Sequence, residues 1–562
     1  MNADQLRILL LVILGLPLVA GVVIALLPRA SLARPLSIGL ALLHLVLTGV
    51  LVGFAAPQLV NREIDPKVVF QPEFVPGVAV NPTTGEINFP HKTTFNLIGL
   101  SPIPADTSVG GIFPAIQFYI GLDGINIWLV ALTSVMMVPV ILMIGNSIQD
   151  RANKFYAWLF LLQTAILGVF LSFDLILFYV FFELTLIPLF FLIGQWGNGA
   201  GRRDAARKFF LYTLAGSLLT LVGAIGIVLS VYSQTKLLTF SIPELAQYLR
   251  QAYATLDPAQ HAYWWNVQTF SFLMLVAGFA VKIPLIPFHS WLPSAYSEAP
   301  ASVTVLLSAL LAKMGTFGLV RICFPFTPDA TLHLGMPLLG LLGVIGIVFG
   351  ALCAYAQTDL KRMIAYSSIS HLGFCVLALV AFNTEGMSGG ILHMVNHGLS
   401  TGALFVLVGL MVDRYGSQPM DSFSGLWNKL PVFTFFMIVM TLASVGLPGL
   451  NNFVSEMLML GSLFDLQNKS MTSLTFAILA GFGIFLSAWY MLTMIQRVFF
   501  GPLREPDMTK PVTDLNRREW LTIAPLGVLC LVLGLFPQPV LNVINKDVEA
   551  LSKVADEARA RQ

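Results

Sequence analysis

The chain has 562 residues, of which 56% are hydrophobic and only 11% are charged. Roughly 25% of the residues of an ordinary soluble domain are charged, so this composition excludes a water-soluble globular fold. The 31 Lys and Arg residues nearly balance the 29 Asp and Glu residues, and the resulting net charge of +2 argues against nucleic acid as a partner.

Long apolar runs bounded by charge, proline or asparagine predict an all-α integral membrane protein. A bilayer span needs about 20 consecutive, mostly apolar residues. Runs of this kind predict fourteen transmembrane helices near residues 8–28, 36–56, 122–146, 155–172, 174–196, 208–232, 268–290, 301–325, 336–356, 361–382, 388–411, 431–463, 472–498 and 519–543. Because this number is even, both termini should lie on one side of the membrane.

The Lys and Arg residues of the connecting loops predict the orientation. Loops after odd-numbered spans hold 17 of them, Lys361 included, and the opposite side holds 12, Arg321 included. Basic residues are retained preferentially on the cytoplasmic side, so we expect both termini to face away from the cytoplasm. The two remaining basic residues, Lys282 and Lys313, are predicted to lie inside the membrane.

Cofactor signals are missing from the sequence. The four cysteines, Cys323, Cys353, Cys375 and Cys530, are scattered singly, without the spacing of metal ligands. We therefore expect no iron–sulfur cluster, zinc site or disulfide in this chain. The long extramembrane segment 57–121 has no metal or nucleotide motif either, and we expect it to form a packed extracytoplasmic cap.

Titratable side chains inside the predicted spans are the main functional signal. A charge at the bilayer centre costs about 2.5 to 3.5 kcal/mol on insertion scales, so each one requires an explanation. The candidates are Glu183, Lys282, Lys313, His371, His397 and Glu456. Acids, bases and imidazoles at comparable depth are typical of a proton relay. The alternative is a buried Glu183–Lys282 ion pair that only fixes helix register, but it leaves Lys313 and Glu456 unexplained.

Two histidines of the predicted span 388–411 have a spacing that would suit metal ligands. His393 and His397 lie four residues apart, which places them on one face of a helix. No third ligand is apparent from the sequence. The pattern therefore favours hydrogen-bonded histidines or a hydrated relay over a metal site.

Two of the predicted spans are interrupted. Pro284 and Pro287 break the seventh span, and Gly446, Pro448 and Gly449 break the twelfth. Five spans separate the breaks, and interrupted helices at corresponding positions of two halves indicate an inverted-repeat transporter. Spans 4–8 and 9–13 would form the two repeats. The alternative is that the proline kinks only aid packing.

Several motifs resemble those of the antiporter-like membrane subunits of respiratory complex I, and within them the subunit M (chain 4) family. The resemblance covers about residues 115–500 and rests on Phe182-Glu183-Leu184-Thr185-Leu186-Ile187-Pro188, Ala280-Val281-Lys282-Ile283-Pro284, His289-Ser290-Trp291-Leu292-Pro293, Glu298-Ala299-Pro300, Lys361-Arg362-Met363-Ile364-Ala365-Tyr366-Ser367-Ser368-Ile369-Ser370-His371, His397-Gly398-Leu399-Ser400 and Asn452-Phe453-Val454-Ser455-Glu456. Glu456 favours subunit M, because the sister subunits L and N usually carry Lys at that position.

The resemblance implies a fold of fourteen helices with two inverted five-helix repeats and discontinuous helices 7 and 12. It divides the chain into helices 1 and 2 (1–56), an extracytoplasmic loop (57–121), helix 3 (122–146), the first repeat (155–325), the second repeat (336–498), and helix 14 with a charged tail (519–562).

The same resemblance implies the roles of the titratable residues. Glu183 and Lys282 would be the coupling pair of the first half-channel, and Lys313 would be the central relay group. His371 and His397 would be polar links. Glu456 would be the group from which the proton leaves.

The function implied is proton translocation within an NADH:quinone oxidoreductase, a translocase whose FMN, iron–sulfur clusters and quinone belong to other subunits. The expected partners are membrane-arm subunits similar to L, N, K and J, together with the lipid bilayer. The expected location is the inner (plasma) membrane of a bacterium rather than a thylakoid or organelle membrane. Two alternatives remain open, which are a multisubunit (Mrp-type) cation/proton antiporter without redox coupling and a scaffold whose buried charges only specify packing.

Overall fold

The computed structural model describes residues 1–78, 91–99, 115–145, 148–236, 238–254, 258–464, 471–506 and 511–561. Much of the predicted extracytoplasmic loop, residues 79–90 and 100–114, lies outside the described residues.

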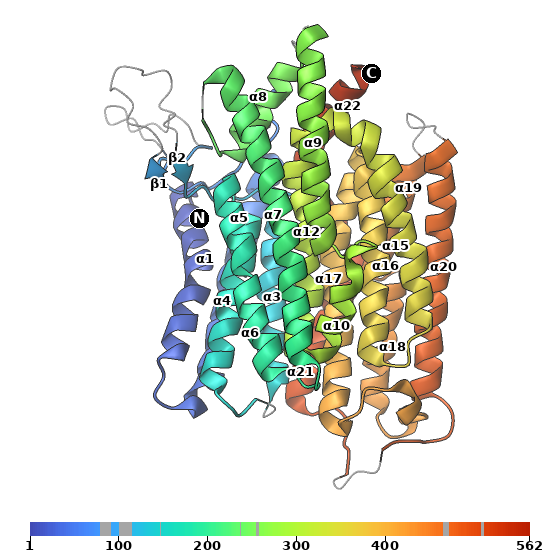
Figure 1. Cartoon of the computed structure of the whole chain (residues 1–562). Helices are drawn as coiled ribbons and strands as arrows, with labels where there is room; N and C mark the ends of the chain where they lie inside the picture. Colours follow the sequence, from blue (N-terminus) through green and yellow to red (C-terminus); the bar gives the residue numbers. More distant parts are fainter. Residues whose placement is uncertain are drawn as a thin grey trace.

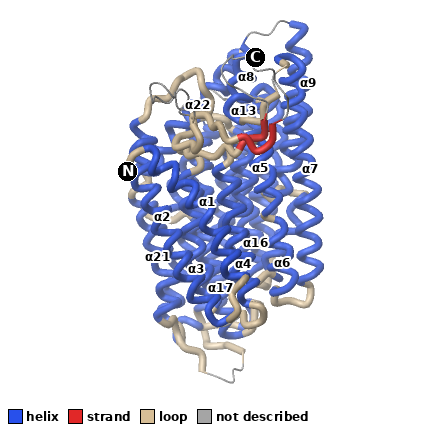
Figure 2. Tube along the Cα trace, turned by 90° about the vertical axis from the view of Figure 1, so that its left-hand side faces the viewer, coloured by secondary structure: helices blue, strands red, loops and turns tan. Residues whose placement is uncertain are grey.

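The first half of the chain is helical apart from one short hairpin. Its helices are α1 (Ala3–Ala25), α2 (Ala33–Asn61), α3 (Ile127–Ile144), α4 (Ala152–Leu171), α5 (Leu175–Leu184), α6 (Leu186–Trp196), α7 (Arg202–Thr235), α8 (Ile242–Ala254) and α9 (Pro258–Lys282). Strands β1 (Asn96–Gly99) and β2 (Ala115–Gln117) pair antiparallel, with Asn96 opposite Gln117. The hairpin lies outside the helical bundle at its upper end (Figures 1 and 2).

The second half contains more interruptions. Its helices are α10 (Trp291–Glu298), α11 (Ala301–Leu306), α12 (Ala312–Gly318), α13 (Phe324–Phe326), α14 (Pro328–Ala330), α15 (Leu341–Tyr355), α16 (Leu360–Val380), α17 (Thr384–Tyr415), α18 (Pro431–Val445), α19 (Asn451–Gly461), α20 (Met471–Phe499), α21 (Arg517–Leu535) and α22 (Gln538–Ala560). Three π-helical segments, Leu307–Leu311, Leu319–Cys323 and Thr331–Gly340, join α11 to α15 in the same region.

Thirteen helical segments of the described chain are long and apolar enough to cross a membrane. They are Ala3–Ala25, Ala30–Asn61, Ile127–Ile144, Ala152–Leu171, Leu175–Trp196, Arg202–Thr235, Gln260–Lys282, Ala301–Phe326, Pro328–Tyr355, Leu360–Val380, Thr384–Tyr415, Thr472–Phe499 and Arg517–Leu535. The predicted twelfth span, 431–463, is present as the two shorter helices α18 and α19. Together these elements confirm the predicted all-α membrane fold with its interrupted helices.

Two predicted spans have different ends in the structure. The seventh, predicted at 268–290, is α9, which begins ten residues earlier and ends at Lys282. The fourteenth, predicted at 519–543, ends at Leu535, and α22 starts after Pro537. Proline at this position begins a new helix because it has no N–H to continue the previous one.

Helix α22 is amphipathic and lies across one end of the bundle. Its buried residues include Val540, Ile544 and Leu551, which recur with a helical period, while charged residues fill the other positions. Its polar contacts join it to the ends of several spans, because Asp547 pairs with Arg62 and accepts a hydrogen bond from the backbone N–H of Gly124. It is therefore not a spanning helix.

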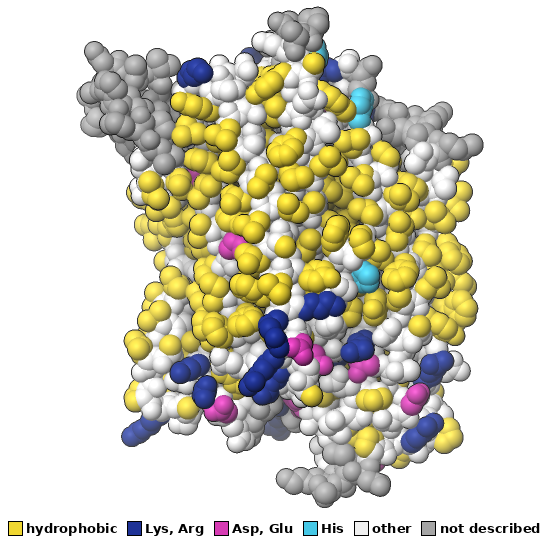
Figure 3. Space-filling model, viewed as in Figure 1, with side chains coloured by type: hydrophobic (Ala, Val, Ile, Leu, Met, Phe, Trp, Pro, Cys, Tyr) yellow, Lys and Arg dark blue, Asp and Glu magenta, His cyan; other side chains and the backbone are white. Residues whose placement is uncertain are grey.

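The spans run side by side, and both termini lie at the upper end of the bundle in Figure 1, as an even number of spans requires. Apolar side chains cover the middle of the surface, and on the face shown Lys and Arg gather toward the opposite, lower end (Figure 3). We call that lower end, which carries the loops after odd-numbered spans, the basic end.

The core of the bundle lies around three spans. All of the most apolar stretch of Ala301–Phe326 is buried, and 94% of the corresponding stretches of α16 and α17 are buried. By contrast, only 28% of the most apolar stretch of the α2 span is buried, which is typical of a helix at the periphery. The buried spans are also those that carry Lys313, His371 and His397.

Candidate functional site

Lys313 lies at the centre of the most buried span. Its side chain is fully buried on α12, between the π-helical segments Leu307–Leu311 and Leu319–Cys323. π-Bulges occur frequently at functional sites. Here the Lys313 Nζ donates to the backbone carbonyl of Ser308, at 2.5 Å, and to Nδ1 of His397, at 2.8 Å.

The contact with Lys313 fixes the tautomer of His397. A lysine ammonium can only donate, so Nδ1 of His397 accepts, and a neutral ring then carries its proton on Nε2. That Nε2 is buried and has no hydrogen-bond partner among the described residues, as is also true of Nε2 of His393. Buried polar atoms normally have partners, so the Nε2–H of His397 is placed to donate to a water or to release its proton.

Three histidines form one cluster, which we call the histidine cluster: His371, His393 and His397. Their ring centroids are 5.5 to 5.9 Å apart. His393 and His397 lie one helical turn apart on α17, and His371 faces them from α16. All three are buried. The structure thus places the two predicted links, His371 and His397, side by side.

Glu456 continues this series on α19. Its Oε1 lies 3.5 Å from Nδ1 of His371, and its side chain is buried. The sequence had left Glu456 without a nearby charge, because His371 is 85 residues away along the chain. Lys313, His397, His371 and Glu456 are therefore consecutive neighbours in space.

The break in the twelfth span makes room for Glu456. Gly446, at the end of α18, has φ of +78°, and a Cβ added there would lie 2.3 Å from Oε2 of Glu456. Only glycine satisfies both the left-handed backbone and the close carboxylate. Helix α19 then begins at Asn451, whose side-chain amide donates to the carbonyl of Asn396 while the Asn396 amide donates to the carbonyl of Asn451. These reciprocal bonds hold α19 against α17.

Glu183 lies near the end of α5 in the fifth span, and Lys282 lies at the break of the seventh. Lys282 is the last residue of α9, where the helix dipole favours a cation. It is buried, donates to Oγ1 of Thr185 at 3.2 Å and lies 4.5 Å from the centroid of the Phe182 ring.

No ion pair within 4 Å joins Glu183 and Lys282, the two residues of the expected coupling pair, although the charge of Glu183 still acts on Lys282. Thr185, which lies between α5 and α6 with helical backbone angles, accepts the Lys282 hydrogen bond. The charge of Glu183 acts on the nearby Tyr179, and Oε1 of Glu183 is buried without a hydrogen-bond partner among the described residues. No hydrogen bond or ion pair between described residues joins Lys282 to Lys313.

Arg321 was expected in a loop and is instead fully buried. Its guanidinium makes a two-point ion pair with Asp123, at 2.5 and 2.9 Å, and both side chains have no exposed surface. The rings of Phe70, Phe173 and Phe317 lie 4.5 to 5.1 Å from the guanidinium carbon. Sequence reasoning missed this pair because Arg321 falls near the end of the predicted span 301–325 and Asp123 at the start of the distant span 122–146.

Lys361 was also counted among the loop residues, but only 1% of it is exposed. Its Nζ donates to the backbone carbonyl of Ala299 at 3.1 Å. The side chain turns inward at the first turn of α16, at the basic end of the bundle.

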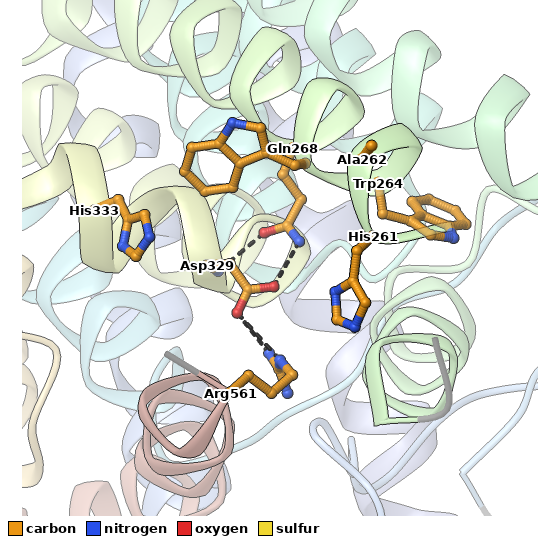
Figure 4. A pocket seen from close by; sticks show the side chains of 8 residues that line it. His261, Ala262, Trp264, Gln268, Asp329, His333 and Arg561 are labelled. Carbon is orange, nitrogen blue, oxygen red and sulfur yellow. Dashed lines mark hydrogen bonds and ion pairs between the residues drawn. The ribbon is translucent and has the colours of Figure 1, made fainter. Parts of the chain in front are cut away.

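A surface pocket of about 450 Å³ lies apart from these groups, where α9 and α14 meet the end of α22. Asp329 is held there by Arg561, at 2.9 Å, and by Gln268, whose side-chain amide donates to it at 2.8 Å (Figure 4). His261 and His333 line the same pocket. Because Arg561 and Gln268 bind the Asp329 carboxylate, this site fastens the end of α22 to the bundle.

Within the described ranges, no three His, Cys, Asp or Glu side chains are arranged to hold a metal ion. The histidine cluster nevertheless offers a lysine, three imidazoles and a carboxylate in succession. Groups of this kind accept and release protons, and histidine does so near neutral pH. The arrangement is suited to passing protons between the two interrupted halves of the bundle.

Comparisons with known proteins agree with this geometry. The family described as NADH:quinone oxidoreductase/Mrp antiporter, TM matches residues 172–485. NADH-quinone oxidoreductase subunit M of Pseudomonas aeruginosa is 36% identical over 433 residues, which cover 76% of this chain and 81% of that protein. F(420)H(2) dehydrogenase subunit M of Methanosarcina mazei is 37% identical over 444 residues, or 79% and 86% of the two chains.

A solved structure is similar over nearly the whole chain. It is a chain of respiratory complex I from Thermus thermophilus with bound NADH, with a TM-score of 0.75 and 27% sequence identity. The similarity covers 97% of this chain and 99% of that one. The six candidate residues, from Glu183 to Glu456, lie within residues 172–485, the range that the family matches.

Proposed function

This chain belongs to the NADH:quinone oxidoreductase/Mrp antiporter family, among the subunit M (chain 4) proteins, and from that premise we propose that it translocates protons within a redox-driven membrane complex. The observation that carries the proposal is the buried series Lys313, His397, His371 and Glu456. A chain that only had to span the membrane would place apolar side chains at these positions.

The proposed relay begins at Lys313. Its proton passes to His397, whose Nδ1 is already its hydrogen-bond acceptor. The proton then crosses the histidine cluster to His371, whose Nδ1 faces Glu456. A histidine can accept a proton on one ring nitrogen and release another from the second. Each ring can therefore pass a proton to the next group without a change in its position.

Glu183 and Lys282 supply the control step in this proposal. A change in a neighbouring subunit moves Glu183 toward or away from Lys282, which alters the proton affinity of that lysine. The structure is compatible with the separated arrangement, in which Thr185 holds Lys282. Lys282 then loads Lys313 through water, since no side chain bridges the two among the described residues.

The energies required are modest. Moving one charge through the full membrane potential takes about 2.3 kcal/mol per 100 mV. A pKa change of one unit corresponds to about 1.36 kcal/mol. A change of about two units in the pKa of a buried lysine is therefore sufficient to move one proton against a membrane potential of about 100 mV.

Substitution of the relay residues tests the proposal. In vesicles containing the whole complex, Glu183→Gln, Lys282→Ala, Lys313→Ala and Glu456→Gln should each abolish proton pumping during quinone reduction. Glu385→Gln and Lys236→Ala change the same residue types in the first turn of α17 and at the exposed end of α7, and should leave pumping intact. Normal pumping in all four relay variants would refute the proposal.

The complex we propose is an NADH:quinone oxidoreductase in the inner membrane of a bacterium. Its FMN, iron–sulfur clusters and quinone site would reside in other subunits, and the neighbours of this chain would be membrane-arm subunits of the L, N, K and J types. The relatives of this chain include subunits of complexes with different electron donors, so the donor is best identified by purification. Isolation of the intact complex should yield flavin and iron–sulfur absorbance together with this chain.

The second candidate is an Mrp-type cation/proton antiporter, because the matched family includes both kinds of protein. An antiporter would exchange cations for protons without a redox substrate. Proton transport that depends on an imposed sodium or potassium gradient, and not on NADH and quinone, would establish it. Proton transport that requires electron transfer would exclude it.

A further inference from the structure

A second series of hydrogen bonds begins at Nε2 of His371, the ring nitrogen that does not face Glu456. It consists of Ser487 and Tyr490 on α20 and Ser367 on α16. Ser487 and Tyr490 lie three residues apart, and Ser367 and His371 lie four apart, so each pair shares one face of its helix. We call these three hydroxyl-bearing residues the hydroxyl branch.

The contacts of the hydroxyl branch are continuous. Nε2 of His371 lies 3.4 Å from Oγ of Ser487, which lies 3.3 Å from the Tyr490 hydroxyl. The Tyr490 hydroxyl donates to Oγ of Ser367 at 2.8 Å. Between 1% and 6% of each of the four residues is exposed, so the branch is shielded from bulk water along its length.

The donors of the branch all point the same way. Because the Tyr490 hydroxyl donates to Ser367, it must accept from Ser487. Ser487 then accepts from Nε2–H of His371. When a proton moves from Ser367 to His371, each hydroxyl gives up its hydrogen toward His371 and receives another from the Ser367 side. The donor order seen here is therefore the order expected after such a transfer.

The branch leads toward the basic end. Helix α16 begins at that end, and α20 ends there, so the step from His371 to Ser367 and the step from Ser487 to Tyr490 both point downward in Figure 1. Ser367 lies six residues beyond Lys361, or about 9 Å along the helix at about 1.5 Å per residue. The carboxyl groups of Asp359, Asp413 and Glu298 lie near enough to Lys361 to interact with its charge.

A small cavity adjoins the upper end of the branch. It is lined by His371, Glu456 and Ser487, with apolar side chains completing its wall, and its free volume of about 10 Å³ is close to that needed by one water. Three polar groups converge on this space, which suits a water that bonds to several of them. The relay and the hydroxyl branch therefore meet at His371.

We propose that Ser487, Tyr490 and Ser367 form a proton-conducting branch through which His371 takes up protons from the basic end of the protein. The inference rests on the proposed function, because it concerns the supply of protons to the same relay.

The transfer starts from the reversed donor order, in which the three hydroxyls have rotated so that Ser487 donates to Nε2 of a His371 ring that carries its proton on Nδ1. From that order it balances without any other reactant. A proton from water at the basic end binds Ser367, which passes its own proton to Tyr490. Tyr490 passes its proton to Ser487, and Ser487 passes its proton to Nε2 of His371. One O–H bond breaks for each bond that forms, and His371 releases its Nδ1 proton to Glu456.

A purely structural role is the competing explanation, since a buried tyrosine hydroxyl requires a partner in any case. The test is therefore made in vesicles containing the whole complex, with proton pumping, the solvent deuterium isotope effect on pumping, and thermal stability measured on the same preparations. The variants are Tyr490→Phe, Ser367→Ala, Ser367→Thr and, as a matched control, Thr493→Val. Thr493 lies on the same helix, but its hydroxyl donates to the backbone of its own helix.

The proposal predicts that Tyr490→Phe and Ser367→Ala lose most of their pumping and show a larger isotope effect, because proton movement becomes limiting. Ser367→Thr, which keeps the hydroxyl, and Thr493→Val should pump normally. Reduced stability with normal pumping and an unchanged isotope effect would assign the branch a structural role and overturn the proposal. If Tyr490→Phe fails to assemble, the Ser367 variants decide the question.

A His371→Ala variant separates this inference from the proposed function. Loss of pumping in His371→Ala with normal pumping in Tyr490→Phe and Ser367→Ala would overturn the branch alone. Normal pumping in His371→Ala as well as in the branch variants would overturn both.

Discussion

Replacing Arg321 by methionine should strongly destabilise the bundle, whereas replacing Asp123 by asparagine at the same time should restore most of the loss. The two side chains form an ion pair with no exposed surface. Arg321→Met alone leaves the Asp123 carboxylate buried without its counter-charge. The double variant leaves no uncompensated charge.

The magnitude follows from the contacts. Removal of one partner from a buried ion pair costs about 3 to 5 kcal/mol. Asp123 keeps two hydrogen bonds in the Arg321→Met variant, from the backbone N–H groups of Ile125 and Asn126 at 3.0 Å. We therefore expect a loss near the lower limit, about 3 kcal/mol, against a total stability of about 5 to 15 kcal/mol for a typical domain.

The assay is detergent-induced unfolding of the chain in lipid bicelles, followed by tryptophan fluorescence. Arg321→Met and Asp123→Asn should each unfold at lower detergent concentration than the unaltered chain. The double variant should be more stable than either single variant, with a coupling free energy of about 3 kcal/mol. Independent effects that simply add in the double variant would refute the assignment of Arg321 and Asp123 as a mutually dependent pair.

Three further predictions address other parts of the chain. Burial raises the pKa of Asp174, which caps α5, to about 6. A carboxyl whose folded pKa is raised favours the folded state most below its unfolded pKa of 3.8, and this contribution falls as pH rises to about 6. Thermal melts at several pH values should therefore show that Asp174→Asn gains stability over the unaltered chain between pH 4 and pH 6, by at most about 3 kcal/mol, and a pH-independent difference would contradict this. Gly124→Ala would place a Cβ 2.0 Å from the backbone oxygen of Val543, so limited proteolysis should cleave α22 faster, while an unchanged rate would show that α22 docks without this contact. Gly446→Ala would place a Cβ 2.3 Å from Oε2 of Glu456, and we expect it to reduce proton pumping without preventing assembly, which normal pumping would disprove.

Much of the fold follows from the sequence because lipid imposes a strong constraint. Backbone groups in the hydrocarbon must be satisfied within the segment, so long apolar runs become helices. The interruptions at Pro284 and at Gly446 were also foreseeable, since these residues disfavour a continuous helix. The end of the fourteenth span was not, because apolar residues continue beyond Pro537 on one face of the amphipathic α22.

The candidate site was only partly predictable for a related reason. Hydrophobic surroundings make Lys313, His371 and Glu456 conspicuous in the sequence, but they do not reveal which of these side chains meet. His371 and Glu456 become neighbours only because the reciprocal Asn396 and Asn451 bonds dock α19 on α17. The hydroxyl branch gave no signal, because buried serines are common in membrane helices and commonly bond to their own backbone.

The expected coupling pair of Glu183 and Lys282 illustrates a different limit. The sequence placed both residues at comparable depth, but it did not indicate that Thr185 would accept the lysine hydrogen bond. Thr185 keeps helical backbone angles within the span Leu175–Trp196. Which side chains of two neighbouring helices meet can be learned only from the structure.

The central claim is that Glu456 changes its protonation state while the complex works. Infrared difference spectroscopy of the reconstituted complex, before and during turnover, measures this directly through the C=O stretch of a protonated carboxyl group. We predict a carboxyl band that appears or disappears with turnover and is missing in Glu456→Gln but present in Glu385→Gln. A spectrum with no carboxyl band that depends on Glu456, in a complex that pumps protons at its normal rate, would contradict the account.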